Sequence, residues 1–215
     1  QTFYYRDQIA STRWVKVSDE NPADGDNGLL DDLKSLIITP AAVSKLKITS
    51  APFSVILGDA SLQISVKSKD QYNNDSPVGQ DTSVYLSANS SGSHFSTTAD
   101  FSQTINSLNI ASGSATASFY FKQTVFTPSQ VITVSDATPA DGATGITDDS
   151  QTETITPGAV TKLVIKSPLS LSGIAGEELG EITVTSQNSN GIEIPVLQNT
   201  QIYFYSTATG KSFSL

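Results

Sequence analysis

One segment of this sequence occurs twice. VSDENPADGDNGLLDD at residues 17–32 is matched by VSDATPADGATGITDD at residues 134–149, so the two copies lie 134 − 17 = 117 residues apart. The match runs without a gap to residues 50 and 167, and ISVKSKDQYNNDSPV from Ile64 matches ITVTSQNSNGIEIPV from Ile182 at an offset of 118. A period of about 117 residues is too long for a solenoid unit and suits a β-sandwich domain. The chain is therefore expected to consist of tandem repeats of one domain.

The repeat divides the chain at two Thr-Pro pairs, because proline ends a strand and stiffens a linker. Residues 1–39 are expected to be the C-terminal part of one repeat, residues 40–156 a complete repeat, and residues 157–215 the N-terminal part of a further repeat. Two explanations of the partial repeats stay open: the chain is a stretch of a longer protein, which we favour, or two chains complete one another strand to strand. The lack of methionine, even at position 1, indicates a processed product or a fragment.

Apolar and polar residues alternate in most segments between the turns. VSKLKIT, LQISVKS and TSVYLSA, which begin at Val43, Leu62 and Thr82, each place their apolar residues on one face. Such alternation predicts half-buried antiparallel strands. GLLDDLKSL at residues 28–36 is compatible with a short helix, but its counterpart GITDDSQTE has the pattern of a loop and a strand, which favours a strand in both copies. The expected fold class is all-β, with tandem immunoglobulin-like β-sandwich repeats.

The composition excludes several classes of function. The chain has 12 Lys and Arg against 21 Asp and Glu, a net charge of −9, which repels phosphate backbones and argues against nucleic-acid binding. It has no cysteine, so disulfides and thiolate zinc sites are excluded. No apolar run approaches the roughly 20 residues of a membrane helix, so no membrane insertion is expected in this segment. The exposed strand positions carry Ser, Thr, Asn and Gln, which indicates an extracellular or cell-surface protein.

Several of these segments resemble a known group of domains. TPGAVTKLVIKS from Thr156, EITVTSQNSNGIEIPV from Glu181, and SATASFYFK from Ser114 followed by TPSQVITVSD are similar to bacterial immunoglobulin-like repeats of the invasin and intimin kind. Such repeats occur in large cell-surface proteins, adhesins and S-layer-type proteins. The resemblance covers nearly the whole chain and implies a rod of tandem β-sandwiches that spaces or displays something. It implies no catalytic residue, and the acidic insertion departs from the family pattern.

The repeated segment is acidic in both copies and is a candidate calcium site. Calcium takes carboxylate and other oxygen ligands, and an ion bound near a domain joint would offset repulsion and make the joint rigid. The alternative is a solvated hairpin turn, since Asp-Gly at residues 24–25 and 141–142 favours a hairpin by itself. The strict DxDxDG spacing is absent. The candidate ligands are Asp19, Asp24, Asp31 and Asp32 in the first copy, and Asp136, Asp141, Asp148 and Asp149 in the second.

No residue pattern predicts catalysis, so the chain is not expected to be an enzyme. His94 is the only histidine, does not recur in the other copy, and is expected to be a loop residue and not a ligand or a catalytic base. Trp14, Phe3, Tyr4 and Tyr5 are compatible with an aromatic platform for sugar, but SFYFK occupies the same place in the next copy. Packing in a sandwich is therefore the favoured role of these aromatic residues.

The sequence thus predicts a structural segment of an extracellular cell-surface protein such as an S-layer, a stalk or an adhesin. Its expected partners are neighbouring copies of itself or adjacent repeats of a longer chain, with a glycan or a host surface as a further ligand. No cofactor is expected other than calcium. The alternative is a carbohydrate-binding or spacer module of a secreted glycan-acting enzyme, which retention on glycans through Trp14 would favour.

Overall fold

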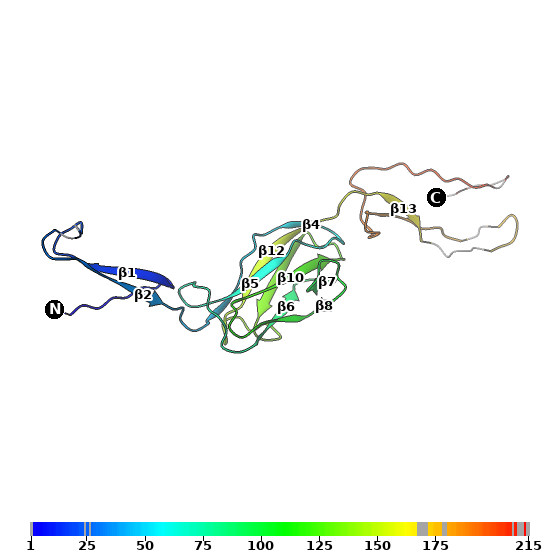
Figure 1. Ribbon diagram of the computed structural model, residues 1–215. Helices are drawn as coiled ribbons and strands as arrows, with labels where there is room; N and C mark the ends of the chain where they lie inside the picture. The colour runs from blue at the N-terminus through cyan, green and yellow to red at the C-terminus, as the bar shows by residue number, and fades with distance from the viewer. Residues whose placement is uncertain are drawn as a thin grey trace.

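The computed structural model describes residues 2–23, 25, 27–166, 172–177, 180–207, 209 and 213. Strands are the only regular secondary structure of these residues, which confirms the all-β prediction. Three parts follow one another in an elongated arrangement (Figure 1). We call them the head hairpin (residues 2–38), the central sandwich (residues 43–156) and the tail segment (residues 157–207). None of the described residues belongs to a helix with the length and apolarity that a bilayer crossing demands.

The central sandwich is built from two five-stranded sheets. One sheet has the order β3 (Lys45–Ile48), β5 (Ile64–Lys69), β10 (Thr116–Gln123), β7 (Ser93–Ser96) and β8 (Thr104–Ile105). The other has the order β4 (Ser54–Ile56), β12 (Asp149–Thr156), β11 (Ser129–Ser135), β6 (Thr82–Ala88) and β9 (Ser107–Ile110). Neighbouring strands in these two sheets are antiparallel, except β12 and β4, which are parallel.

The core lies between these sheets, and the alternation seen in the sequence explains it. Along β10, Phe119 and Phe121 point inward and are fully buried, because residues two apart lie on the same face of a strand. Phe95 from β7 packs against both rings, with an edge-on contact to Phe119 at 5.8 Å between ring centroids. Leu46 on β3 and Val134 on β11 complete the two sides of this core. The β-sandwich architecture predicted from this alternation is therefore present in the central sandwich.

The head hairpin consists of β1 (Ser11–Val17) and β2 (Asp32–Ile38), which pair so that Val17 lies opposite Asp32. In the central sandwich Val134 lies opposite Asp149, 117 residues further along in both strands. β2 also answers the question left by GLLDDLKSL. In this segment, residues 28–31 form a loop and residues 32–36 belong to the predicted strand, and the second copy has the same division.

The tail segment pairs β13 (Lys162–Ile165) with β14 (Val184–Gln187), and Lys162 lies opposite Gln187. In the central sandwich Lys45 lies opposite Lys69, so this register is also the same at the offsets of 117 and 118. The chain of 215 residues covers less than two periods of about 117, so the period and the boundaries of the repeats stay predictions.

Equivalent apolar side chains are buried to different degrees in the three parts. Leu46 is 1% exposed, whereas Leu163 at the same place in the tail segment is 47% exposed. Val134 is fully buried, whereas Val17 in the head hairpin is 50% exposed. Among the residues that the structure describes, the head hairpin and the tail segment thus have the strand pairing of the sandwich but no second sheet over their apolar faces.

Candidate functional site

The acidic loop of the central sandwich connects β11 to β12 and brings three predicted ligands together. Carboxylate oxygens of Asp136, Asp141 and Asp148 lie within 4.8 Å of one another. The loop lies at the end of the sandwich that follows the first linker, Thr39-Pro40-Ala41, because Thr147 forms backbone hydrogen bonds with Ser44 and Leu46. Asp149, the fourth predicted ligand of this copy, does not belong to this cluster of carboxylates. It begins β12 and accepts hydrogen bonds from Lys47 Nζ at 2.9 Å and Ile48 N at 2.8 Å.

Backbone N–H groups hold two of these carboxylates in place. Asp136 Oδ2 accepts a hydrogen bond from Ile146 N at 3.0 Å, and Asp148 Oδ2 accepts one from Gly142 N at 2.8 Å. Gly145 has φ +68°, and a Cβ there would lie 2.7 Å from Asp136 Oδ2, so this position requires glycine. The other oxygens, Asp136 Oδ1 and Asp148 Oδ1, are buried and have no hydrogen-bond partner. A buried carboxylate oxygen without a partner is destabilising, and a cation would relieve this.

The acidic loop of the head hairpin repeats this construction. Asp19 Oδ2 accepts a hydrogen bond from Leu29 N at 3.0 Å, and Asp31 Oδ2 accepts one from Gly25 N at 2.9 Å. Asp31 Oδ1 is again buried without a hydrogen-bond partner. Asp24 lies outside the described residues. Asp32 is exposed at the start of β2 and accepts a hydrogen bond only from the adjacent Leu33 N among the contacts described.

The two acidic loops differ in their compensating charge. In the head hairpin, Lys16 forms an ion pair with Asp31 and holds the pKa of that carboxyl below its ordinary value, with help from the Ser18 hydroxyl. The residue that corresponds to Lys16 in the central sandwich is Thr133, which carries no charge. In the described part of the chain, no lysine or arginine pairs with the three clustered carboxylates of the central loop. The central loop is therefore the better candidate for a divalent cation.

The other candidate residues lie apart from this loop. The expectation that His94 lies in a loop was wrong, because it is an exposed residue of β7 (Ser93–Ser96). Its Nε2 lies 3.4 Å from the Thr124 hydroxyl. Trp14 on β1 is 64% exposed and Tyr4 is 96% exposed. The structure assigns no strand to Thr2–Asp7, so the favoured packing of these aromatic residues in a sandwich is not seen in this chain.

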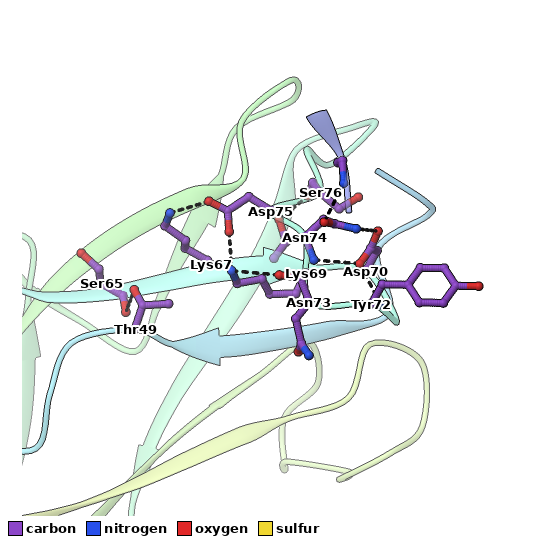
Figure 2. Close-up of polar contacts among 12 residues, drawn as sticks. Thr49, Ser65, Lys67, Lys69, Asp70, Tyr72, Asn73, Asn74, Asp75 and Ser76 are labelled. Atoms are coloured by element: carbon purple, nitrogen blue, oxygen red, sulfur yellow. Dashed lines mark hydrogen bonds and ion pairs between the residues drawn. The ribbon is translucent and has the colours of Figure 1, made fainter. Parts of the chain in front are cut away.

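A second polar cluster occurs where the head hairpin meets the central sandwich, and sequence reasoning missed it. The loop after β5, residues 70–76, which we call the first joint loop, forms hydrogen bonds to both the linker and the head hairpin. Figure 2 shows Asp70, Tyr72 and Asn74 within this loop. Asn74 accepts a hydrogen bond from Ala10 N at 2.9 Å and donates to Gln8 O at 2.8 Å. Asp70 is fully buried and accepts a hydrogen bond from the linker at Ala41 N, 2.9 Å away. The only available signal was that the DQYNN turn has a counterpart of similar polarity, NSNGI, from Asn188.

Asp70 makes this first joint sensitive to acid. Burial by itself raises the pKa of the Asp70 carboxyl, but hydrogen bonds from Asn74, Ala41 and Tyr72 outweigh it and hold the pKa below its ordinary value. Lys67 and Lys69, on the strand that precedes Asp70, form ion pairs with Asp75. A carboxyl with a lowered pKa stabilises the fold above its unfolded-state pKa, about 3.9, and this contribution is lost as the pH falls through the folded-state value.

We therefore expect the side-chain carbonyl resonance of Asp70 to titrate with a midpoint below about 3.9 in an NMR pH titration. The amide of Ala41 should begin to exchange faster over the same range of pH, because its acceptor becomes neutral. The Asp70→Asn variant has no carboxyl there and should show no such acid transition at Ala41. A midpoint at or above the ordinary value would contradict the assignment.

Comparisons with known proteins are limited to weak structural likenesses. No protein-family model matches the chain, and no curated protein matches it. Domains 4 and 5 of the S-layer protein SbsC are similar with a TM-score of 0.34 and 15% identity, over 68% of this chain and 58% of that structure. A glycosyl hydrolase family 2 member from Bacteroides cellulosilyticus DSM 14838 has a TM-score of 0.39 and 12% identity, over 56% of this chain and 16% of that one. A β-glucuronidase of glycoside hydrolase family 2 has a TM-score of 0.42 and 16% identity, over 84% of this chain and 18% of that one.

Proposed function

We propose that this chain is a structural segment of an extracellular cell-surface protein of the S-layer, stalk or adhesin kind, built from stacked bacterial immunoglobulin-like sandwiches. The observation that carries this proposal is the shared register of the three parts. β1 and β2 pair as β11 and β12 do, and β13 and β14 pair as β3 and β5 do. A unit copied in series adds length with each copy, which suits a spacer.

Direct hydrogen bonds at both joints support a mechanical role. At the first joint, Asn74 bonds to backbone groups of Gln8 and Ala10 in the head hairpin. At the second joint, Asn188 Nδ2 donates to Leu57 O at 2.9 Å, and Asn190 Nδ2 donates to Asp59 Oδ1 at 2.8 Å. Side chains that bridge consecutive units restrict the angle between them, as a rod requires.

Small-angle X-ray scattering tests the serial arrangement. A compact 215-residue protein has a radius of gyration of about 17 Å. We expect the chain to exceed this value clearly and to keep its elongated scattering profile at several protein concentrations, because its three parts extend along one direction (Figure 1). A radius of gyration near 17 Å would mean that the parts fold back on one another, which would contradict a rod.

We further propose that the acidic loop of the central sandwich binds calcium through Asp136, Asp141 and Asp148. The support is the pair of buried carboxylate oxygens without partners, in a loop that has no lysine in the place of Lys16. Calcium accepts six to eight oxygen ligands at about 2.3–2.6 Å, so backbone carbonyls or water would complete the set. Bound beside the first linker, the ion would make this end of the sandwich rigid.

We expect calcium to raise the melting temperature of the central sandwich by several degrees in scanning calorimetry. A ligand present at a hundred times its Kd stabilises the folded state by about 2.7 kcal/mol. Asp148→Asn should abolish the shift, because it removes a charged ligand but keeps an acceptor for Gly142 N. Asp149→Asn is the matched control from the same end of the loop and should leave the shift intact. Equal shifts in the two variants, or none in the parent, would refute the site.

A second function, carbohydrate binding, is favoured by one observation. Trp14 and Tyr4 are largely exposed on the head hairpin, and exposed aromatic rings stack on sugars. Retention on immobilised glycans that is lost in Trp14→Ala would support a carbohydrate-binding module over a spacer. Unaltered passage of the parent over the same glycans would leave the structural role as the better proposal.

A further inference from the structure

A side chain at the same place in the repeat forms a hydrogen bond to each linker. It is the first residue after β5 at the first joint and the first residue after β14 at the second joint. Asp70 begins the first joint loop and Asn188 begins its counterpart after β14, residues 188–194, which we call the second joint loop. Asp70 is fully buried and Asn188 is 2% exposed. The linkers that they contact, Thr39-Pro40-Ala41 and Thr156-Pro157-Gly158, also occupy equivalent places in the sequence.

The two joint loops have the same internal hydrogen bonds. Asp70 Oδ1 accepts from Tyr72 N and Asn74 N, both at 2.9 Å. Asn188 Oδ1 accepts from Asn190 N at 3.0 Å and Ile192 N at 3.1 Å. These bonds fix one side-chain oxygen inside each loop, and they identify the remaining atom of each side chain as the one that faces the linker.

The remaining atoms have opposite hydrogen-bonding character. At the first joint, Asp70 Oδ2 accepts from Ala41 N at 2.9 Å. At the second joint, Asn188 Nδ2 donates to Pro157 O at 3.1 Å. Pro40 C=O with Ala41 N–H, and Pro157 C=O with Gly158 N–H, are the same peptide group in the two linkers. One joint thus presents the N–H of this group to the loop and the other presents its C=O.

A reversed peptide group needs a different backbone conformation at the residue that follows it. Gly158 has φ +76°, which glycine adopts without strain, whereas Ala41 is not among the described residues with positive φ. A Cβ at position 158 would also lie 2.9 Å from Ile56 Cγ2. Aspartate facing N–H therefore occurs with alanine, and asparagine facing C=O occurs with glycine.

We infer that the residue pair at positions 70 and 41, or 188 and 158, selects between two joint types by setting the orientation of the linker peptide group. An exchange of Asp70 and Asn188 between the two joints would place the wrong hydrogen-bonding group against the linker peptide. Asparagine at position 70 would turn its NH2 toward Ala41 N–H, and aspartate at position 188 would turn an oxygen toward Pro157 O. The contacts to the preceding unit change with the joint type, since Asn74 bonds to Gln8 and Ala10 at one joint and Asn190 bonds to Leu57 and Asp59 at the other.

The inference is tested at the first linker with Asp70→Asn, Ala41→Gly and the double variant. The chain has no cysteine, so Lys34→Cys and Thr116→Cys provide spin-label sites on the head hairpin and the central sandwich. Asp70→Asn should broaden the distance distribution and accelerate exchange of the Ala41 amide by about tenfold or more, because a charge-assisted hydrogen bond is lost. The double variant should recover a narrow distribution. Asp75→Asn, in the same loop but paired with Lys67 and Lys69, is the control and should match the parent.

Two results would overturn the inference. One is an Asp70→Asn variant with the parent's distance distribution and exchange rate. The other is a double variant as broad as Asp70→Asn alone, because the glycine would then not permit the alternative peptide orientation. The inference rests on the serial arrangement proposed above, and a broad distribution in the labelled parent would count against that arrangement. The exchange rate of the Ala41 amide does not depend on the arrangement and would still decide the inference.

Discussion

Replacement of Leu46 by alanine is expected to lower the free energy of unfolding of the central sandwich by about 3 kcal/mol. Leu46 is 1% exposed and lies in the core between the two sheets. Removal of its side chain sacrifices buried apolar surface and leaves a cavity that close-packed neighbours fill only in part. Denaturant unfolding followed by far-UV circular dichroism measures the loss. Tryptophan fluorescence does not serve here, because Trp14 lies in the head hairpin.

Leu163→Ala is the matched control for this prediction. Leu163 occupies the same place in β13, opposite Ser186, as Leu46 occupies in β3, opposite Ser68, but it is 47% exposed. We expect its replacement to change the unfolding of the central sandwich by less than about 0.5 kcal/mol. Equal losses from the two variants would show that Leu163 is buried in solution and that the apolar face of β13 is covered.

Replacement of Glu153 by alanine is expected to lower the free energy of unfolding by about 2 kcal/mol. Glu153 lies on β12 and is 1% exposed, opposite the fully buried Gln130 on β11. Its Oε2 accepts a hydrogen bond from Phe53 N at 2.7 Å, and its Oε1 accepts one from Gln151 Nε2 at 2.6 Å. Alanine leaves both donors without their partner, and an unpaired buried donor is costlier than the hydrogen bond itself is stabilising.

Glu153→Gln tests the cause of that loss. Glutamine has the same shape but only one acceptor oxygen, so it retains one of the two hydrogen bonds and should lose less stability than alanine. Urea unfolding of the two variants against the parent gives the order. If glutamine proved as destabilising as alanine, the carboxylate charge and not the count of acceptors would be responsible. Equal stability of all three proteins would show that these bonds contribute nothing.

Several features of the fold were predictable because they are local. The alternation in VSKLKIT and TSVYLSA predicted strands at β3 and β6, and the shared acidic segment predicted the same hairpin at β1–β2 and β11–β12. A hairpin pairs residues that are close in the chain, so its register follows from the turn and the flanking pattern. The requirement for glycine at position 145 is also local, since Gly145 and Asp136 belong to the same loop.

The candidate site was predictable in part. The repeated acidic residues predicted a calcium site, and the structure brings the carboxylates of Asp136, Asp141 and Asp148 together, while calcium binding there stays a prediction. Proximity in the sequence also included Asp149, which instead bonds to β3 because the parallel course of residues 44–48 and 147–149 brings Lys47 and Ile48 beside it. The buried joint residues Asp70 and Asn188 carried no recognisable motif, because their partners lie about 30 residues away or in the preceding unit.

By itself the sequence predicted strands such as β3, β5 and β6 and the matching acidic hairpins, since the alternation of side chains and the turn residues act between neighbours in the chain. Only the tertiary structure decided which copies of a residue are buried. Leu46 and Leu163 have the same local pattern, yet within the described residues a second sheet covers Leu46 and none covers Leu163. The tertiary structure also decided which end of each linker peptide group faces its joint loop. Burial and such contacts require segments far apart in the chain to meet, and no local pattern specifies that meeting.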